Sequence, residues 1–180
     1  DPDVVAQHLV TLATLGTEGA PGTVKWMLED PRARVRAAAA LCAFRLGLAE
    51  DLAEQTFTEL AHAEDVGERL DLAQVMQPFA HEPLAARCKV LLSDSSEDVR
   101  GAACRAAGAI KSPTLLDDLL VCFACIGPRD EAGVALSNLG DVAVGALGKI
   151  AQDEKVPLAL RQRIPRILAT VDTDQAGQVL

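Results

Sequence analysis

The chain has 180 residues, 49% of them hydrophobic, and a formal net charge of −9 at pH 7. Aromatic residues make up only 3%, so Ala, Leu and Val must supply most of any core. The negative charge argues against nonspecific nucleic-acid binding, which needs a basic surface to neutralise phosphates. Runs of β-branched or aromatic residues at a period of two are absent, which argues against a strand-rich fold.

Apolar residues recur at helical spacing along the chain and predict a succession of helices. Asp30-Pro31 and Ser112-Pro113 resemble N-cap and first-turn pairs, and Ser95 with Asp98 fits a capping box. The intervening loops are short, so consecutive helices should form antiparallel hairpins. The predicted helices span residues 3–16, 20–29, 31–47, 49–62, 65–80, 83–92, 95–110, 113–126, 129–140, 142–152 and 157–171, with a further helix starting at 174.

Glycines and arginines recur with a period of about 31 residues. Gly16, Gly47, Gly108 and Gly140 each follow an Ala/Leu-rich run and are predicted to close a helix. The arginines keep the same period near the starts of these runs, at Arg36, Arg69, Arg100, and Arg161 or Arg163, with Glu131 in one place. A fixed period of this length with two helices per unit is typical of an α-solenoid, here of five to six hairpins.

Two segments of the sequence resemble the HEAT repeat motif. They are Asp30-Pro31-x-x-x-Val35-Arg36-x-Ala38-Ala39 and Asp94-x-x-x-Asp98-Val99-Arg100-x-Ala102-Ala103. The resemblance implies an all-α, right-handed α-α superhelix with Val-Arg helices on the concave side and leucine-rich helices outside. It covers residues 1–180 as a single domain, although Gly67-Glu68-Arg69-Leu70 departs from the motif. The chain begins at Asp1 and stops in mid-pattern, so we expect a fragment of a longer protein.

A second resemblance concerns the segment Leu160–Ala169, which has a proline inside a helical run. It is similar to the HEAT segment fused to bacterial transporters of the ATP/ADP-translocase type. This resemblance implies a soluble regulatory segment of a membrane nucleotide transporter. No apolar run is long enough to insert into a membrane, and five cysteines in apolar runs are typical of free thiols in a reducing compartment. The predicted location is therefore cytoplasmic.

The sequence contains no complete catalytic or metal-binding motif. Cys122-x-x-Cys125 lacks a second ligand pair for zinc, and His81-Glu82 is a single pair where a metal site needs several ligands. Gly145 to Ile150 lacks the glycine and the hydroxyl residue of a phosphate-binding loop. We therefore predict a non-catalytic protein-interaction or scaffold domain without cofactor or metal, whose partner is another protein or another domain of the same chain. An enzyme of HEAT type, such as a lyase or glycosylase, is the less favoured alternative.

The arginines suggest an alternative function. All but Arg87 lie on or at the start of the Val-Arg type of helix, and three of them, Arg36, Arg100 and Arg161, are predicted to bridge to a carboxylate or carbonyl of the adjacent repeat. The others could line a groove for an acidic or phosphorylated peptide, a nucleotide or DNA. DNA is disfavoured because no aromatic residues accompany the arginines. The candidate ligand-binding residues are Arg32, Arg36, Arg69, Arg105, Arg163 and Arg166.

Overall fold

The computed structural model describes residues 1–15 and 20–171, and these form helices and turns without a β-strand. The all-α prediction is therefore confirmed. The α-helices are α1 (Pro2–Leu15), α2 (Ala20–Met27), α3 (Ala33–Leu46), α4 (Glu50–Ala61), α5 (Val66–Met76), α6 (Ala85–Leu92), α7 (Glu97–Ile110), α8 (Leu116–Ala124), α9 (Arg129–Asn138), α10 (Asp141–Gln152), α11 (Leu158–Arg161) and α12 (Ile164–Leu168). Three 3-10 turns accompany them: η1 (Gln77–Phe79), η2 (Glu82–Leu84) and η3 (Pro113–Leu115).

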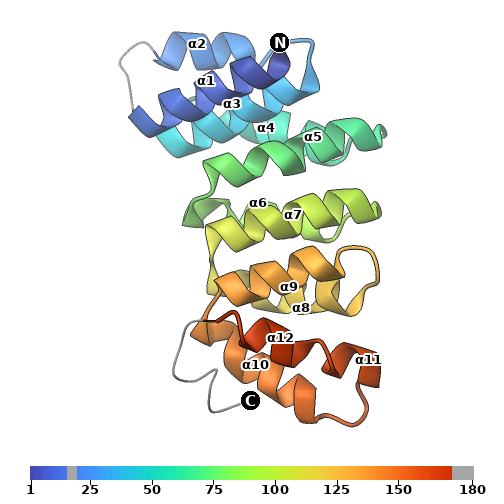
Figure 1. The fold of residues 1–180 in the computed structure, drawn as a ribbon. Coiled ribbons are helices and arrows are strands. Elements are labelled where there is room, and N and C mark those ends of the chain that lie inside the picture. Colours follow the sequence, from blue (N-terminus) through green and yellow to red (C-terminus); the bar gives the residue numbers. More distant parts are fainter. Residues whose placement is uncertain (16–19, 172–180) are drawn as a thin grey trace.

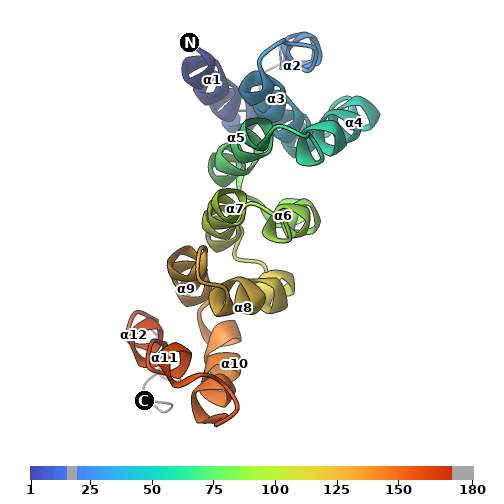
Figure 2. The same ribbon diagram turned by 90° about the vertical axis from the view of Figure 1, so that its right-hand side faces the viewer.

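The helices are arranged in two layers (Figures 1 and 2). Layer A consists of α1, α3, α5, α7, α9 and α12, and each of these helices packs against the next. Layer B consists of α2, α4, α6, α8 and α10, which pack against helices of layer A. The two Val-Arg helices, α3 and α7, both belong to layer A, so the two helix types of the sequence separate into two layers.

The core between the layers is built from small side chains. In α3 every residue from Ala37 to Ala43 is completely buried, and α7 is buried along most of its length. Alanine keeps the helix stable while letting neighbouring backbones approach closely. One such close approach is at Gly108, where a Cβ would lie 3.0 Å from the Cα of Ala135 in α9.

The periodic glycines have two different roles. Gly47 and Gly140 have φ values of 65° and 61° and follow the ends of α3 and α9, as predicted. Gly108 does not close a helix, because α7 continues to Ile110 and Lys111 adopts the left-handed conformation instead. Gly16 lies outside the described residues.

Prolines shorten several of the predicted helices. The predicted helices 83–92 and 113–126 begin as the 3-10 turns η2 and η3, which contain Pro83 and Pro113. The predicted helix 65–80 ends as α5 at Met76 and continues as the 3-10 turn η1, which contains Pro78. The predicted helix 157–171 is broken into α11 and α12, because Pro165 in the first turn of α12 cannot continue the α11 hydrogen bonds. The predicted helix starting at 174 lies outside the described residues.

The three predicted caps are not formed. Ser112 precedes the 3-10 turn η3, and its side chain makes no cap hydrogen bond. Asp30 is not the N-cap of α3, which begins two residues later than predicted; its carboxylate accepts a hydrogen bond from the Arg32 amide instead. Ser95 makes no capping box, because the N-cap residue of α7 is Ser96 and its amide donates to the Asp94 carboxylate. In both turns an aspartate carboxylate accepts a hydrogen bond from the amide two residues later, and the helix has no side-chain cap.

The apolar run Leu119–Ile126 is buried on one side only. Leu119, Cys122 and Phe123 face the core, but Val121 is 66% exposed and Ile126 is 85% exposed. The helix α8 is therefore amphipathic, with its apolar stripe against α9 and α7. Trp26 on α2 is also mostly exposed.

Candidate functional site

Five arginines, four of them on layer A helices and one on α11, hold the turns that precede their own helices. In each case the guanidinium donates hydrogen bonds to backbone carbonyls five or six residues earlier, which a helix end or turn leaves without partners. The planar fork of arginine suits paired carbonyls because it presents several donors in fixed directions. We call these residues the turn arginines: Arg36, Arg69, Arg100, Arg129 and Arg161.

The turn arginines account for the periodicity of the sequence. The fourth position of the series is Arg129, which bonds the carbonyls of Phe123 and Ala124, and not Glu131. The fifth is Arg161 and not Arg163, since Arg161 donates to the carbonyl of Val156. The sequence predicted that Arg36, Arg100 and Arg161 bridge to the adjacent repeat, but the carbonyls that they bond lie in the turn before the same helix. Arg36 in addition lies 3.7 Å from Glu68 of α5, in the adjacent repeat.

A second set of contacts links successive layer A helices by ion pairs. Arg34 of α3 pairs with Asp3 of α1 and with Asp71 of α5, the latter at 2.9 Å. Arg105 of α7 lies 3.4 Å from Glu131 of α9. Arg163, just before α12, lies 2.6 Å from Asp130 of α9. The pairs form a ladder along the layer, although the exposed ones contribute little stability each.

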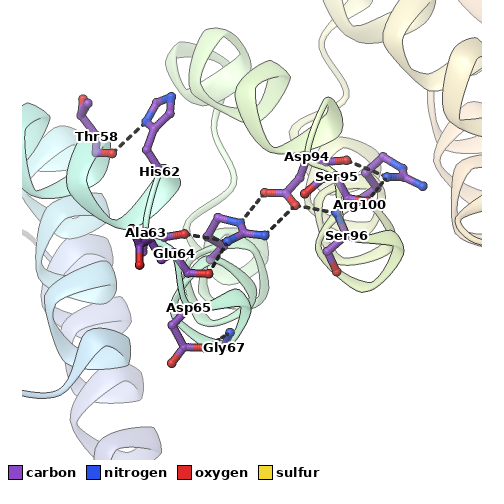
Figure 3. Close-up of polar contacts among 11 residues, drawn as sticks. Thr58, His62, Ala63, Glu64, Asp65, Gly67, Asp94, Ser95, Ser96 and Arg100 are labelled. Carbon is purple, nitrogen blue, oxygen red and sulfur yellow. Dashed lines mark hydrogen bonds and ion pairs between the residues drawn. The ribbon is translucent and has the colours of Figure 1, made fainter.

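The most buried ion pair joins the α4–α5 hairpin to the turn before α7. Arg69 Nε lies 2.8 Å from Asp94 Oδ2, and their side chains are only 12% and 7% exposed. Arg69 also bonds the carbonyls of Ala63 and Glu64. Figure 3 shows Asp94 between these carbonyls and the start of the next helix, where it accepts from the Ser96 amide.

The six predicted ligand-binding arginines do not form one free cationic surface. Arg32 is bidentate to Asp30, and Arg36 bonds two carbonyls and lies 3.7 Å from Glu68. Of the six, only Arg166 makes no hydrogen bond or ion pair with another described residue. Five of the six are thus already paired with carboxylates of the chain: Arg32, Arg36, Arg69, Arg105 and Arg163.

A cleft of about 240 Å³ opens on layer A between α5, α7 and α9. It sets three carboxylates against one guanidinium, a net charge of −2 from the lining side chains. Its guanidinium, Arg105, is already paired with Glu131, while Asp98 makes no hydrogen bond or ion pair with any described residue. The lining residues are Leu70, Gln74, Glu97, Asp98, Gly101, Arg105, Gly127 and Glu131.

One glycine, Gly127, makes room for a carboxylate of the cleft. A Cβ at Gly127 would lie 2.4 Å from the carboxyl carbon of Glu97, so only glycine allows Glu97 to occupy this position. A Cβ at Gly101 would meet Glu131 at an ordinary 3.7 Å. Glu97 has one weak partner, Arg100 at 4.0 Å, and its side chain is 65% exposed.

The cleft has no signature in the sequence, because its residues come from three separate repeats. Glu131 did stand out, but as a replacement for an arginine and not as a surface carboxylate. Asp98 fitted a capping box with Ser95, and acidic residues such as Glu97 are common at helix starts, so neither indicates a cleft. Proximity of α5, α7 and α9 residues becomes visible only once layer A is assembled.

One carboxyl group and three thiols have pKa values strongly shifted by their surroundings. The hydrogen bond from Arg32 lowers the pKa of Asp30 to about 2. Burial raises the pKa of Cys42 to about 11 and, together with the nearby Asp118 and Cys122, that of Cys88 to about 12. A hydrogen bond to Cys122, along with burial, also raises the pKa of Cys104. None of these groups lines the cleft.

The cysteines are all free thiols, four of them buried and Cys125 partly exposed. Within residues 1–15 and 20–171, no three His, Cys, Asp or Glu side chains are grouped as a metal ion would require. No helix in the described part of the chain has the length and apolar character needed to cross a membrane. The sequence matches no protein-family model and no curated protein.

Proposed function

We propose that the chain is a non-catalytic HEAT-type α-solenoid module that binds a protein segment across the exposed face of layer A. The observation that carries the proposal is the cleft between α5, α7 and α9. Successive helices of a solenoid present side chains on one continuous surface, and such surfaces serve as extended binding sites. The right-handed superhelix and the association with a translocase-type transporter remain predictions from the sequence resemblance.

Anion binding, the alternative from the sequence, has weaker support. Five of the six candidate arginines are paired with carboxylates of the chain, so an anion would have to displace those partners. The cleft itself carries more negative than positive side chains. The arginines are better explained as residues that hold the turns and join neighbouring helices.

The proposal can be tested by selecting peptides from a random 12-residue phage-display library with the immobilised chain. Enriched peptides should lose binding when Gly101→Leu fills the cleft. They should keep binding when Val121→Ser alters the exposed face of α8 in layer B. A second blocking variant, Gln74→Trp, covers the same cleft from an exposed position, in case Gly101→Leu lowers the thermal midpoint.

The outcome contradicting the proposal is equally clear. If no peptide is enriched, or if enriched peptides bind both cleft variants as tightly as the wild type, layer A does not bind protein segments at this cleft.

A further inference from the structure

We propose that the cleft between α5, α7 and α9 receives the side chain of an arginine or lysine from the bound segment. This inference rests on the proposed function, because it names the chemistry of the segment that layer A would bind. It commits to a basic partner segment, in contrast to the anionic ligand suggested by the arginine count.

The charges of the cleft are incompletely compensated from within the chain. Asp98 has no hydrogen-bond or ion-pair partner among the described residues, and the single partner of Glu97 lies 4.0 Å away. Glu131 is shared with Arg105 at 3.4 Å. A cation entering between them would gain three carboxylates within one small volume, while an anion would meet net repulsion.

The shape and polarity of the cleft suit a long side chain with a charged end. Leu70 is packed against the core and offers an apolar lining from α5, and Gly101 lines the cleft from α7 without a side chain. Lysine and arginine lay their methylene stems on apolar surface while the charged end stays among polar groups. The volume of about 240 Å³ is several times the ~30 Å³ share of one water molecule.

A cleft, and not merely acidity, distinguishes this place from the rest of the negatively charged surface. The helix α4 also begins with Glu-Asp, as Glu50 and Asp51, and carries Glu54 and Glu59 on the same helix. None of these residues lines the cleft. The first two residues of α4 are therefore a matched control for the first two residues of α7, with the same residue types at the same helical positions.

The test uses four acetylated and amidated peptides, GSA-X-ASG with X as Arg, Lys, Gln or Glu, titrated into the ¹⁵N-labelled chain. The Arg and Lys peptides should shift the amide signals of Leu70, Gly101 and Gly127 in a saturable manner, and the Gln and Glu peptides should not. Glu97→Gln with Asp98→Asn should weaken binding by about tenfold or more, whereas Glu50→Gln with Asp51→Asn should leave it unchanged. Raising the salt from about 0.05 M to about 0.5 M should also weaken it.

Three results would overturn the inference. They are equal amide shifts with the Gln and Arg peptides, binding that is weakened by the α4 double variant, and an unchanged affinity in the α7 double variant. If phage-selected peptides still need an open cleft but share no basic residue, the proposed function stands and the cationic inference falls. If those peptides bind the cleft variants as tightly as the wild type, both the proposed function and the cationic inference are wrong. The α7 changes are isosteric, and circular dichroism with a thermal scan verifies folding; the single variants replace the double one if it is unfolded.

Discussion

Arg69 and Asp94 form the one ion pair of the ladder in which both side chains are almost completely buried. Two hydrogen bonds join them, at 2.8 and 3.3 Å, and each partner is satisfied further by backbone groups of its own turn. The pair therefore connects two consecutive hairpins through side chains that are largely shielded from water. Removing one partner of a buried pair costs more folding stability than removing one partner of an exposed pair of the same residue types.

We expect Asp94→Asn to destabilise the fold by about 3 kcal/mol, because it leaves the guanidinium of Arg69 buried without its counter-charge. The measurement is the free energy of unfolding from urea titration monitored by circular dichroism. Asp130→Asn is the control, since Asp130 is 85% exposed and its pair with Arg163 should contribute less than about 1 kcal/mol. Equal effects of the two variants would show that burial of the Arg69–Asp94 pair is unimportant.

A turn arginine should contribute more stability than an arginine at the edge of the cleft. Arg100→Ala removes hydrogen bonds of 2.6 and 3.0 Å to the carbonyls of Asp94 and Ser95, and should cost about 1–3 kcal/mol. Arg105→Ala removes only an exposed pair and should cost less than about 1 kcal/mol. Urea titrations of both variants provide the comparison, and the reverse order would refute the assigned role of the turn arginines.

Two helical glycines should respond oppositely to the same substitution. Gly108→Ala places a Cβ 3.0 Å from the backbone of α9, so overpacking should cost about 1–3 kcal/mol despite the better helix propensity of alanine. Gly145→Ala on α10 meets nothing within 4 Å and should stabilise the chain by about 0.5–1 kcal/mol. Thermal midpoints of the two variants should therefore move in opposite directions from that of the wild type.

These glycines illustrate what the sequence could and could not predict. Helical periodicity placed the helices α1 to α10 closely, because apolar spacing and short loops are local properties. The role of Gly108 is not local: it depends on Ala135 lying against it from the next repeat. The same holds for the cleft, where Glu97 and Glu131 are brought together only by packing of α7 against α9.

The arginine periodicity was recognised in the sequence, but its groove was not confirmed as a free cationic surface. Counting charges on one helix type cannot show that Arg69 and Arg105 have acidic partners on other elements. In the folded chain, acidic side chains from neighbouring elements neutralise these arginines.

Asp30 should contribute to the loss of folding stability at acidic pH. Its pKa in the folded chain is about 2, below the ordinary value of 3.8, so its stabilising effect is complete above about pH 4. The effect is lost as the pH falls through 2. Carboxyl ¹³C titration should give a midpoint near 2 in the wild type and a higher midpoint in Arg32→Ala. An unchanged midpoint in that variant would show that Arg32 is not the cause.

Thiol reactivity should separate Cys125 from the other four cysteines. Burial keeps Cys42 and Cys88 protonated, with pKa values of about 11 and 12, and also shields Cys104 and Cys122 from reagents. At pH 8 we expect Ellman's reagent to modify one thiol rapidly in the native chain and five in denaturant. Cys125→Ser should abolish the rapid phase, and its persistence would indicate that a buried thiol becomes accessible.

Asp94 belongs at once to two hairpins, since it receives Arg69 from one and holds the first turn of the next through Ser96. A fragment of this array that ends before the α6–α7 turn would thus keep Arg69 and lose its partner Asp94. The segment that keeps the ion pair intact therefore does not coincide with one helical hairpin. It runs from α5 through the turn that contains Asp94. Anyone who lengthens or shortens the array by whole units should place the junctions inside helix α7, after that turn, so that arginine and aspartate travel together.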